Sequence, residues 1–240
     1  MVSGGGAEAD GSAGPEAAAD AWDVSAIHAT ALAALQQQAA ADEAEQAVYG
    51  FDAWPELTYH PLLADAYAAA GWGAHRECRF PSDWQKRRKT HGERCDLVLT
   101  RGGRPLQEAG RNAEDPAPLF IAADPSLQPV PASSAFWLEV KLVAQFEVGG
   151  AFRRYAAELG QVVVKDLKKL RNDPLIRHAG LLLILQTANE ARADRDLSLW
   201  LSKAESDGWP VDTVVPGGFP INDRIGNAWC SVTLVGVCGQ

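Results

Sequence analysis

The chain of 240 residues is 47% hydrophobic and carries a net charge of −9. Its length and composition are those of a globular protein with a substantial core. No apolar stretch is long enough to cross a bilayer, and four cysteines are too sparse for a disulfide framework. We therefore exclude a transmembrane protein and a disulfide-rich secreted protein, and we expect a cytoplasmic protein that makes no membrane contact.

The negative charge is concentrated near the N-terminus. Residues 1–70 contain 11 Asp or Glu and no Lys or Arg, which leaves 22 basic and 20 acidic residues in the remainder. Residues 1–21 are an acidic, Gly- and Ala-rich stretch without a hydrophobic anchor, and we expect a disordered tail there. Residues 22–240 are expected to form a single α/β domain. Its strand-bearing part is slightly basic, so the overall charge does not exclude a nucleic-acid partner.

Hydrophobic periodicity predicts four helices and five strands in this domain. The expected helices cover residues 22–49, 55–70, 151–171 and 196–206. The expected strands cover residues 75–80, 94–100, 135–143, 178–187 and 229–237. Residues 101–134 are rich in Gly, Pro and Ala, and we expect a mobile surface insertion there, anchored at most by Leu119 to Ile121.

The order of these elements predicts the architecture. Residues 52–190 read helix, strand, strand, strand, helix, strand, preceded by an extra N-terminal helix. Three consecutive strands followed by a helical crossover imply a mixed β-sheet with helices on its faces.

Charged residues interrupt two of the expected strands. Glu139 and Lys141 flank Val140 within an apolar run, and Asp96 opens the apolar run of an earlier strand. Side chains alternate between the faces of a strand, so Glu139 and Lys141 point to the same side. Buried charges are costly unless they are paired or bind something. An acid on one strand, with an acid and a lysine on the next, is the layout of a metal-dependent site that cleaves phosphodiesters.

Asp96 and the Glu139-x-Lys141 motif, together with the element order, resemble the PD-(D/E)xK nuclease superfamily, which has the restriction-endonuclease-like fold. In this resemblance Glu56 matches an acid often found on the first core helix, and Gln161 and Lys165 lie on the helix that follows the active site. The resemblance implies a Mg²⁺-dependent nuclease, a DNA endonuclease or exonuclease, in which Mn²⁺ could replace Mg²⁺.

The residue types suit that chemistry. Mg²⁺ prefers carboxylate, carbonyl and water oxygens, which Asp96, Glu139 and the carbonyl of Val140 could supply. The ion would lower the pKa of a bound water and stabilise charge on the scissile phosphate. Lys141 would orient the attacking water or stabilise the developing negative charge. Glu56 could hold the metal through water.

A basic stretch between the first two expected strands is a candidate nucleic-acid surface. Phosphate contact and base stacking on Trp84 are one interpretation, and a solvated hairpin is the other. The candidate contacts are Arg79, Lys86, Arg87, Arg88 and Lys89, with Gln161 and Lys165 on the later helix.

Two other interpretations of the site stay open. Glu139 and Lys141 could be a structural ion pair, and Glu56 a favourable acid in the first turn of a helix. The chain could also be a non-catalytic member of the same fold that binds nucleic acid or protein. A homodimer or a protein partner is compatible with the sequence.

Overall fold

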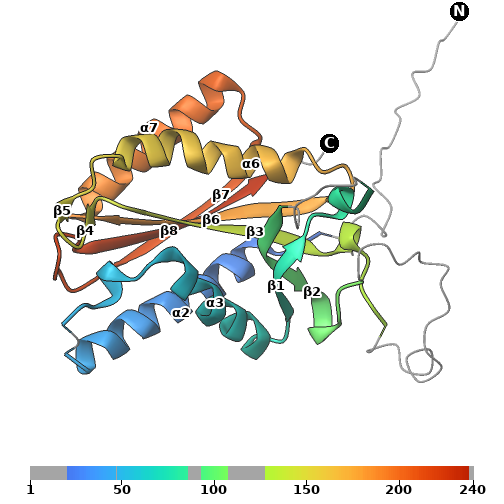
Figure 1. Cartoon of the computed structure of the whole chain (residues 1–240), viewed down its shortest axis with the longest axis horizontal. Coiled ribbons are helices and arrows are strands. Elements are labelled where there is room, and N and C mark those ends of the chain that lie inside the picture. Colours follow the sequence, from blue (N-terminus) through green and yellow to red (C-terminus); the bar gives the residue numbers. More distant parts are fainter. Residues whose placement is uncertain (1–20, 47, 86–92, 108–127, 238–240) are drawn as a thin grey trace, which may run out of the picture.

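The computed structural model describes residues 21–46, 48–85, 93–107 and 128–237. A six-stranded sheet in the order β1-β2-β3-β6-β8-β7 lies between two layers of helices (Figure 1). The pair β3–β6 is parallel, and the other four neighbouring pairs are antiparallel. The predicted mixed α/β sheet with helices on its faces is therefore confirmed.

The first helical layer consists of α2 (Val24–Ala44) and α3 (Glu56–Ala69). The carboxylate of Asp23 accepts a hydrogen bond from the Ala26 backbone N–H and caps α2, as such residues do at helix starts. Apolar side chains of both helices pack on one face of the sheet, where they contact inward-facing leucines of the central strands. This layer carries Glu56 and brings it to the middle of the sheet.

The second helical layer consists of α6 (Val163–Arg171) and α7 (Glu190–Asp207) on the opposite face (Figure 1). Leu167 and Leu170 of α6 pack in one cluster with Trp137 of β3, and all three are fully buried. Because α6 crosses β3, its polar edge lies beside the charged residues of that strand.

The strands predicted at residues 94–100, 178–187 and 229–237 form as β2 (Arg94–Thr100), β6 (His178–Thr187) and β8 (Trp229–Val237). The other two predicted strands form with shifted ends, as β1 (Gly73–Arg79) and β3 (Phe136–Ala144). An edge strand, β7 (Val211–Pro220), was not predicted.

The prediction of a helix over residues 151–171 was wrong for the residues before Tyr155. Gly149 and Gly150 have positive φ values of 116° and 121°, and they turn the chain between two short strands, β4 (Phe146–Glu147) and β5 (Gly150–Ala151). Helix α5 (Tyr155–Ala157) follows and leads through a π-helical turn, Glu158–Val162, into α6. The expected helix over residues 196–206 also begins earlier, because the Asn189 side chain caps α7.

Three predicted segments fall wholly or largely outside the described residues. They are the tail up to residue 20, the basic stretch 86–92 and residues 108–127 of the insertion. At the described base of the insertion, Leu106 and Val130 form a β-bridge. Within the described parts of the chain, no helix combines the length and the hydropathy that crossing a bilayer requires.

Candidate functional site

The site is built where β2 and β3 separate. The two strands pair from Leu99 with Phe136 to Leu97 with Leu138. Beyond Leu97 the backbones of β2 and β3 no longer pair. There the side chain of Asp96 contacts β3 instead, and its Oδ2 accepts a hydrogen bond of 2.8 Å from the Val140 N–H. The carboxylate of Asp96 is thereby fixed beside the segment that carries Glu139.

Glu139 is only 3% exposed, and its Oε1 lies 2.7 Å from Nζ of Lys169 on α6. Burial raises the pKa of Glu139 to about 9, and the neighbouring charge of Asp96 acts in the same direction, while Lys169 opposes both. Asp96 and Glu139 therefore lie close enough for their charges to interact, and the two groups would repel each other if both were ionised. A cation between them would relieve that repulsion.

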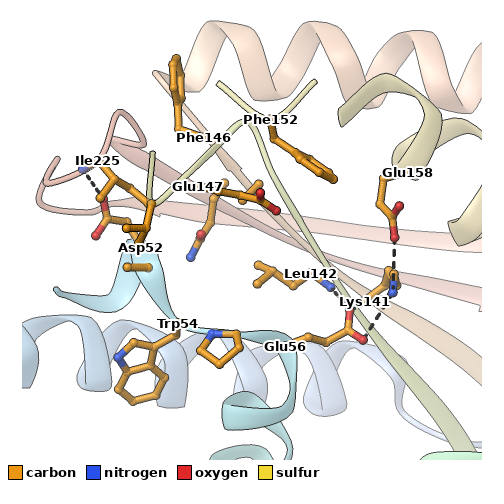
Figure 2. Close-up of a pocket in the computed structure, with 15 residues that line it drawn as sticks. Asp52, Trp54, Glu56, Lys141, Leu142, Phe146, Glu147, Phe152, Glu158 and Ile225 are labelled. Carbon is orange, nitrogen blue, oxygen red and sulfur yellow. Dashed lines mark hydrogen bonds and ion pairs between the residues drawn. The ribbon is translucent and has the colours of Figure 1, made fainter. Parts of the chain in front are cut away.

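Lys141 is held by acids from two other elements (Figure 2). Its Nζ lies 3.0 Å from Oε2 of Glu56 on α3 and 3.7 Å from Oε1 of Glu158 in the π-helical turn. Oε2 of Glu56 also accepts a 2.9 Å hydrogen bond from the Leu142 N–H, which fixes its position. Burial acts to lower the pKa of Lys141, but these carboxylates and Asp166 raise it overall, so the ammonium stays charged.

A second group of metal-binding side chains surrounds Asp96. Ligand atoms of His60, Glu77 and Asp96 all lie within 4.8 Å of one another. His60 projects from α3 and is 2% exposed, and its Nδ1 lies 3.9 Å from Oε1 of Glu77 and 4.0 Å from Oδ1 of Asp96. Glu77 on β1 has a positive φ of 54°, a strained conformation for a residue with a side chain. Local strain of this kind is often retained where it positions a functional group.

The donor set fits a divalent cation. Carboxylates and an imidazole are common ligands of divalent metals, and Asp96 belongs both to the His60–Glu77 group and to the pair with Glu139. The ammonium of Lys169 lies 2.7 Å from the buried carboxyl of Glu139 and opposes the rise in the pKa of that group. Lys169 also lies 4.0 Å from Asp166, so a second carboxylate stands beside this ammonium on α6.

Three residues of this site, His60, Glu77 and Glu158, escaped sequence reasoning, and the contact of Lys169 with Glu139 was not predicted. A usable signal existed for His60, because it stands four residues after Glu56 and so shares its face of the helix. Glu77 and Lys169 gave no comparable signal, since isolated charges on an edge strand and on a basic helix are ordinary surface features.

The predicted nucleic-acid contacts are only partly placed. Lys165 is exposed and lines a depression of about 290 Å³ together with Lys168, Lys169 and Phe80. Gln161 is exposed in the π-helical turn, and Arg79 is half-buried at the end of β1. Lys86, Arg87, Arg88 and Lys89 lie outside the described residues.

Comparisons with protein-family models, with curated proteins and with solved structures found no match to this chain. Any functional assignment therefore depends on the geometry of the site.

Proposed function

We propose that this chain is a metal-dependent nuclease that hydrolyses phosphodiester bonds, most simply those of DNA, by direct attack of water. The observation that carries the proposal is the meeting of Asp96 and Glu139 at the point where β2 leaves β3, with charged Lys141 two residues farther along. The element order α3-β1-β2-β3-α6-β6, with β3 parallel to β6, supports the resemblance to the restriction-endonuclease-like fold.

Asp96 and Glu139 would hold the ion, with the carbonyl of Val140 available as a further oxygen ligand. When bound, a divalent ion acidifies a coordinated water and stabilises negative charge on a phosphate. Mg²⁺ favours an all-oxygen shell, whereas His60 adds a nitrogen donor that suits a transition metal such as Mn²⁺. Both ions are therefore candidates for the cofactor.

Lys141 supplies the positive charge that the reaction needs beside the metal. Its ammonium can donate to a phosphate oxygen or to the attacking water, and Glu56 and Glu158 keep it charged and positioned. Glu56 is then a positioning residue, because its contacts in the structure are with Lys141 and the Leu142 N–H.

One observation favours a second candidate, a non-catalytic member of the same fold that binds nucleic acid or protein. Glu139 already pairs with Lys169, and Lys141 with Glu56, in the absence of a metal. A buried charge network of this kind can be purely structural. Cleavage activity separates the two candidates.

The proposal is tested by incubating the protein with plasmid and with single-stranded DNA in Mg²⁺, in Mn²⁺ and in EDTA. We expect cleavage with either ion and none in EDTA. Lys141→Ala, purified in the same way, controls for contaminating nucleases. Cleavage that persists in EDTA, or that is absent with both ions on both substrates, would reject a metal-dependent nuclease.

Nucleic-acid affinity should depend on the lysines beside the site. The double variant Lys165→Glu, Lys168→Glu reverses two exposed charges of α6 in the depression next to Lys169. We expect it to bind DNA about tenfold more weakly at low salt and to flatten the salt dependence, since each phosphate contact contributes a slope of about −0.9 in log K against log salt on duplex DNA.

A matched control for this double variant is Lys203→Glu on α7, whose ammonium pairs with Asp207 at 2.8 Å. It should bind DNA as the wild type does in a fluorescence-anisotropy titration. Because Lys203→Glu changes the net charge half as much, a loss of binding free energy half as large as that of the double variant would show that only net charge matters and that the depression is not a binding surface.

A further inference from the structure

A cleft of about 440 Å³ is lined by Lys141, Leu142 and Ala144 of β3 (Figure 2). Its size is in the range of sites that hold small molecules. Three aromatic side chains line it: Trp54 at the approach to α3, Phe146 on β4, and Phe152 just after β5. Lys141, Glu56 and Glu158 lie at its border, so the cleft is continuous with the proposed active site.

The aromatic wall of the cleft is held in place by its surroundings. Asn227 is fully buried and exchanges two hydrogen bonds with the backbone of Phe146, of 3.2 Å and 2.9 Å. A side chain at Gly226 would meet the ring of Phe146 at 2.5 Å, so the glycine leaves the space that this ring occupies. The N–H of Phe152 donates to the Gln145 carbonyl at 2.9 Å. The wall therefore needs little rearrangement to receive a ligand.

The polar groups of the cleft are mainly acceptors. Gln186 lines it and is fully buried, and its Oε1 has no hydrogen-bond partner among the described residues. Glu147 and Glu158 add carboxylates, and Lys141 is the lining residue that carries a positive charge. Such a cleft repels a phosphate group and favours a flat, uncharged ring that donates hydrogen bonds.

We infer that this cleft binds one unpaired nucleobase of the substrate strand, next to the phosphate that Lys141 faces. The inference rests on the proposed function and extends it, because it makes single-stranded nucleic acid the preferred substrate. A base stacks on aromatic side chains through its π-face, whatever its sequence. Exocyclic amino groups of the base can donate to Oε1 of Gln186 and to the carboxylate of Glu147. A base within an intact duplex is already stacked and paired, so it would have to leave the helix to enter.

The experiment compares binding of a fluorescein-labelled 15-nucleotide DNA strand with binding of its blunt duplex, by anisotropy in EDTA, which prevents metal-dependent cleavage. The test variant is Phe152→Leu, which keeps an apolar side chain but removes the ring. Trp209→Leu is its matched control, because Phe152 and Trp209 are both partly buried aromatics packed against the same core cluster. Circular dichroism checks that each variant is folded.

We expect the wild type to prefer the single strand. Phe152→Leu should weaken single-strand binding about 5- to 150-fold, the range expected for losing one base–aromatic stack. The affinity of Phe152→Leu for the duplex should stay within about twofold of the wild type. Trp209→Leu should bind the single strand and the duplex as the wild type does, within the same limit. Equal weakening for both DNA forms, no weakening by Phe152→Leu, or no binding of the single strand by the wild type would overturn the inference.

This outcome is separable from the fate of the proposed nuclease. If the binding pattern holds but no cleavage occurs with Mg²⁺ or Mn²⁺, the cleft is a base-binding site in a non-catalytic protein. If the wild type cleaves DNA and Phe152→Leu binds the single strand as the wild type does, the nuclease stands and the assignment of the cleft is wrong.

Discussion

Replacing Asp96 by Asn should abolish Mn²⁺ binding and slow metal-dependent cleavage by about a thousandfold or more. Asp96 is the carboxylate shared between Glu139 and the His60–Glu77 group, so its loss affects every arrangement of the ion that the structure allows. A bound metal ion contributes several kcal/mol to stabilising charge in the transition state, and about 1.4 kcal/mol corresponds to a factor of ten in rate. The amide oxygen of Asn can still accept the hydrogen bond from the Val140 N–H, so the fold should persist.

Thermal unfolding with and without Mn²⁺ measures this effect, because a ligand that binds only the folded state raises the melting temperature. The wild type and Asp212→Asn, a control on the exposed face of edge strand β7, should both be stabilised by Mn²⁺. Asp96→Asn should show no stabilisation. An equal shift in all three proteins would place the metal elsewhere in the chain.

Glu139→Gln should make the metal-free protein more stable at pH 8, by on the order of 2 kcal/mol, and should remove part of its pH dependence. Burial and Asp96 raise the pKa of Glu139 to about 9 from an ordinary value near 4.5, so the folded state holds this proton more tightly than the unfolded state. Stability from this group is therefore full below about pH 4.5 and is lost as pH rises toward about 9. Gln carries no ionisable proton and avoids that loss.

Urea unfolding of the wild type and of Glu139→Gln at several pH values between 5 and 9 measures this difference. The two curves should converge near pH 5 and separate as pH rises. Lys169→Met should have the opposite effect on stability. It removes the ammonium that stabilises ionised Glu139, so it should destabilise the protein most at high pH, where Glu139 loses its proton. Parallel curves for the wild type and Glu139→Gln would show that the charge of Glu139 is fully stabilised by its neighbours.

The same raised pKa of Glu139 predicts that metal binding is linked to proton release. A carboxyl group must lose its proton to bind a cation, so affinity for Mn²⁺ should increase with pH up to about 9. Isothermal titration in two buffers of different ionisation enthalpy would measure the released proton. Zero proton release at pH 7 would indicate that Glu139 is not a ligand of the ion.

Strong local patterns made much of the fold predictable. The strands β2, β6 and β8 are long apolar or β-branched runs, and their predicted bounds match the structure. Strand β7 was missed because Pro216, Gly217, Gly218 and Pro220 read as a loop. At the edge of a sheet, proline is tolerated, because one side of the strand needs no backbone donors.

The site was predictable only where a residue contradicted its surroundings. Asp96 and Glu139 stood out as acids within apolar strands, and the structure places them together. His60, Glu77 and Lys169 come from three other elements, and their approach to the two acids depends on how helices α3 and α6 pack on the sheet. Local sequence patterns carry no information on that packing, and the positive φ of Glu77 has no sequence signature either.

The initial rate of Mg²⁺-dependent cleavage of single-stranded DNA tests the central claim most directly, when wild type, Lys141→Ala and Lys203→Ala are compared at equal concentration. Lys141 faces the proposed phosphate position, whereas Lys203 pairs with Asp207 on the exposed surface of α7. The wild type and Lys203→Ala should cleave at the same rate, and Lys141→Ala at least about a hundredfold more slowly, as expected when one group that stabilises developing charge is removed. Equal rates in all three proteins, or no cleavage by any of them, would contradict the assignment of a nuclease site at Asp96, Glu139 and Lys141.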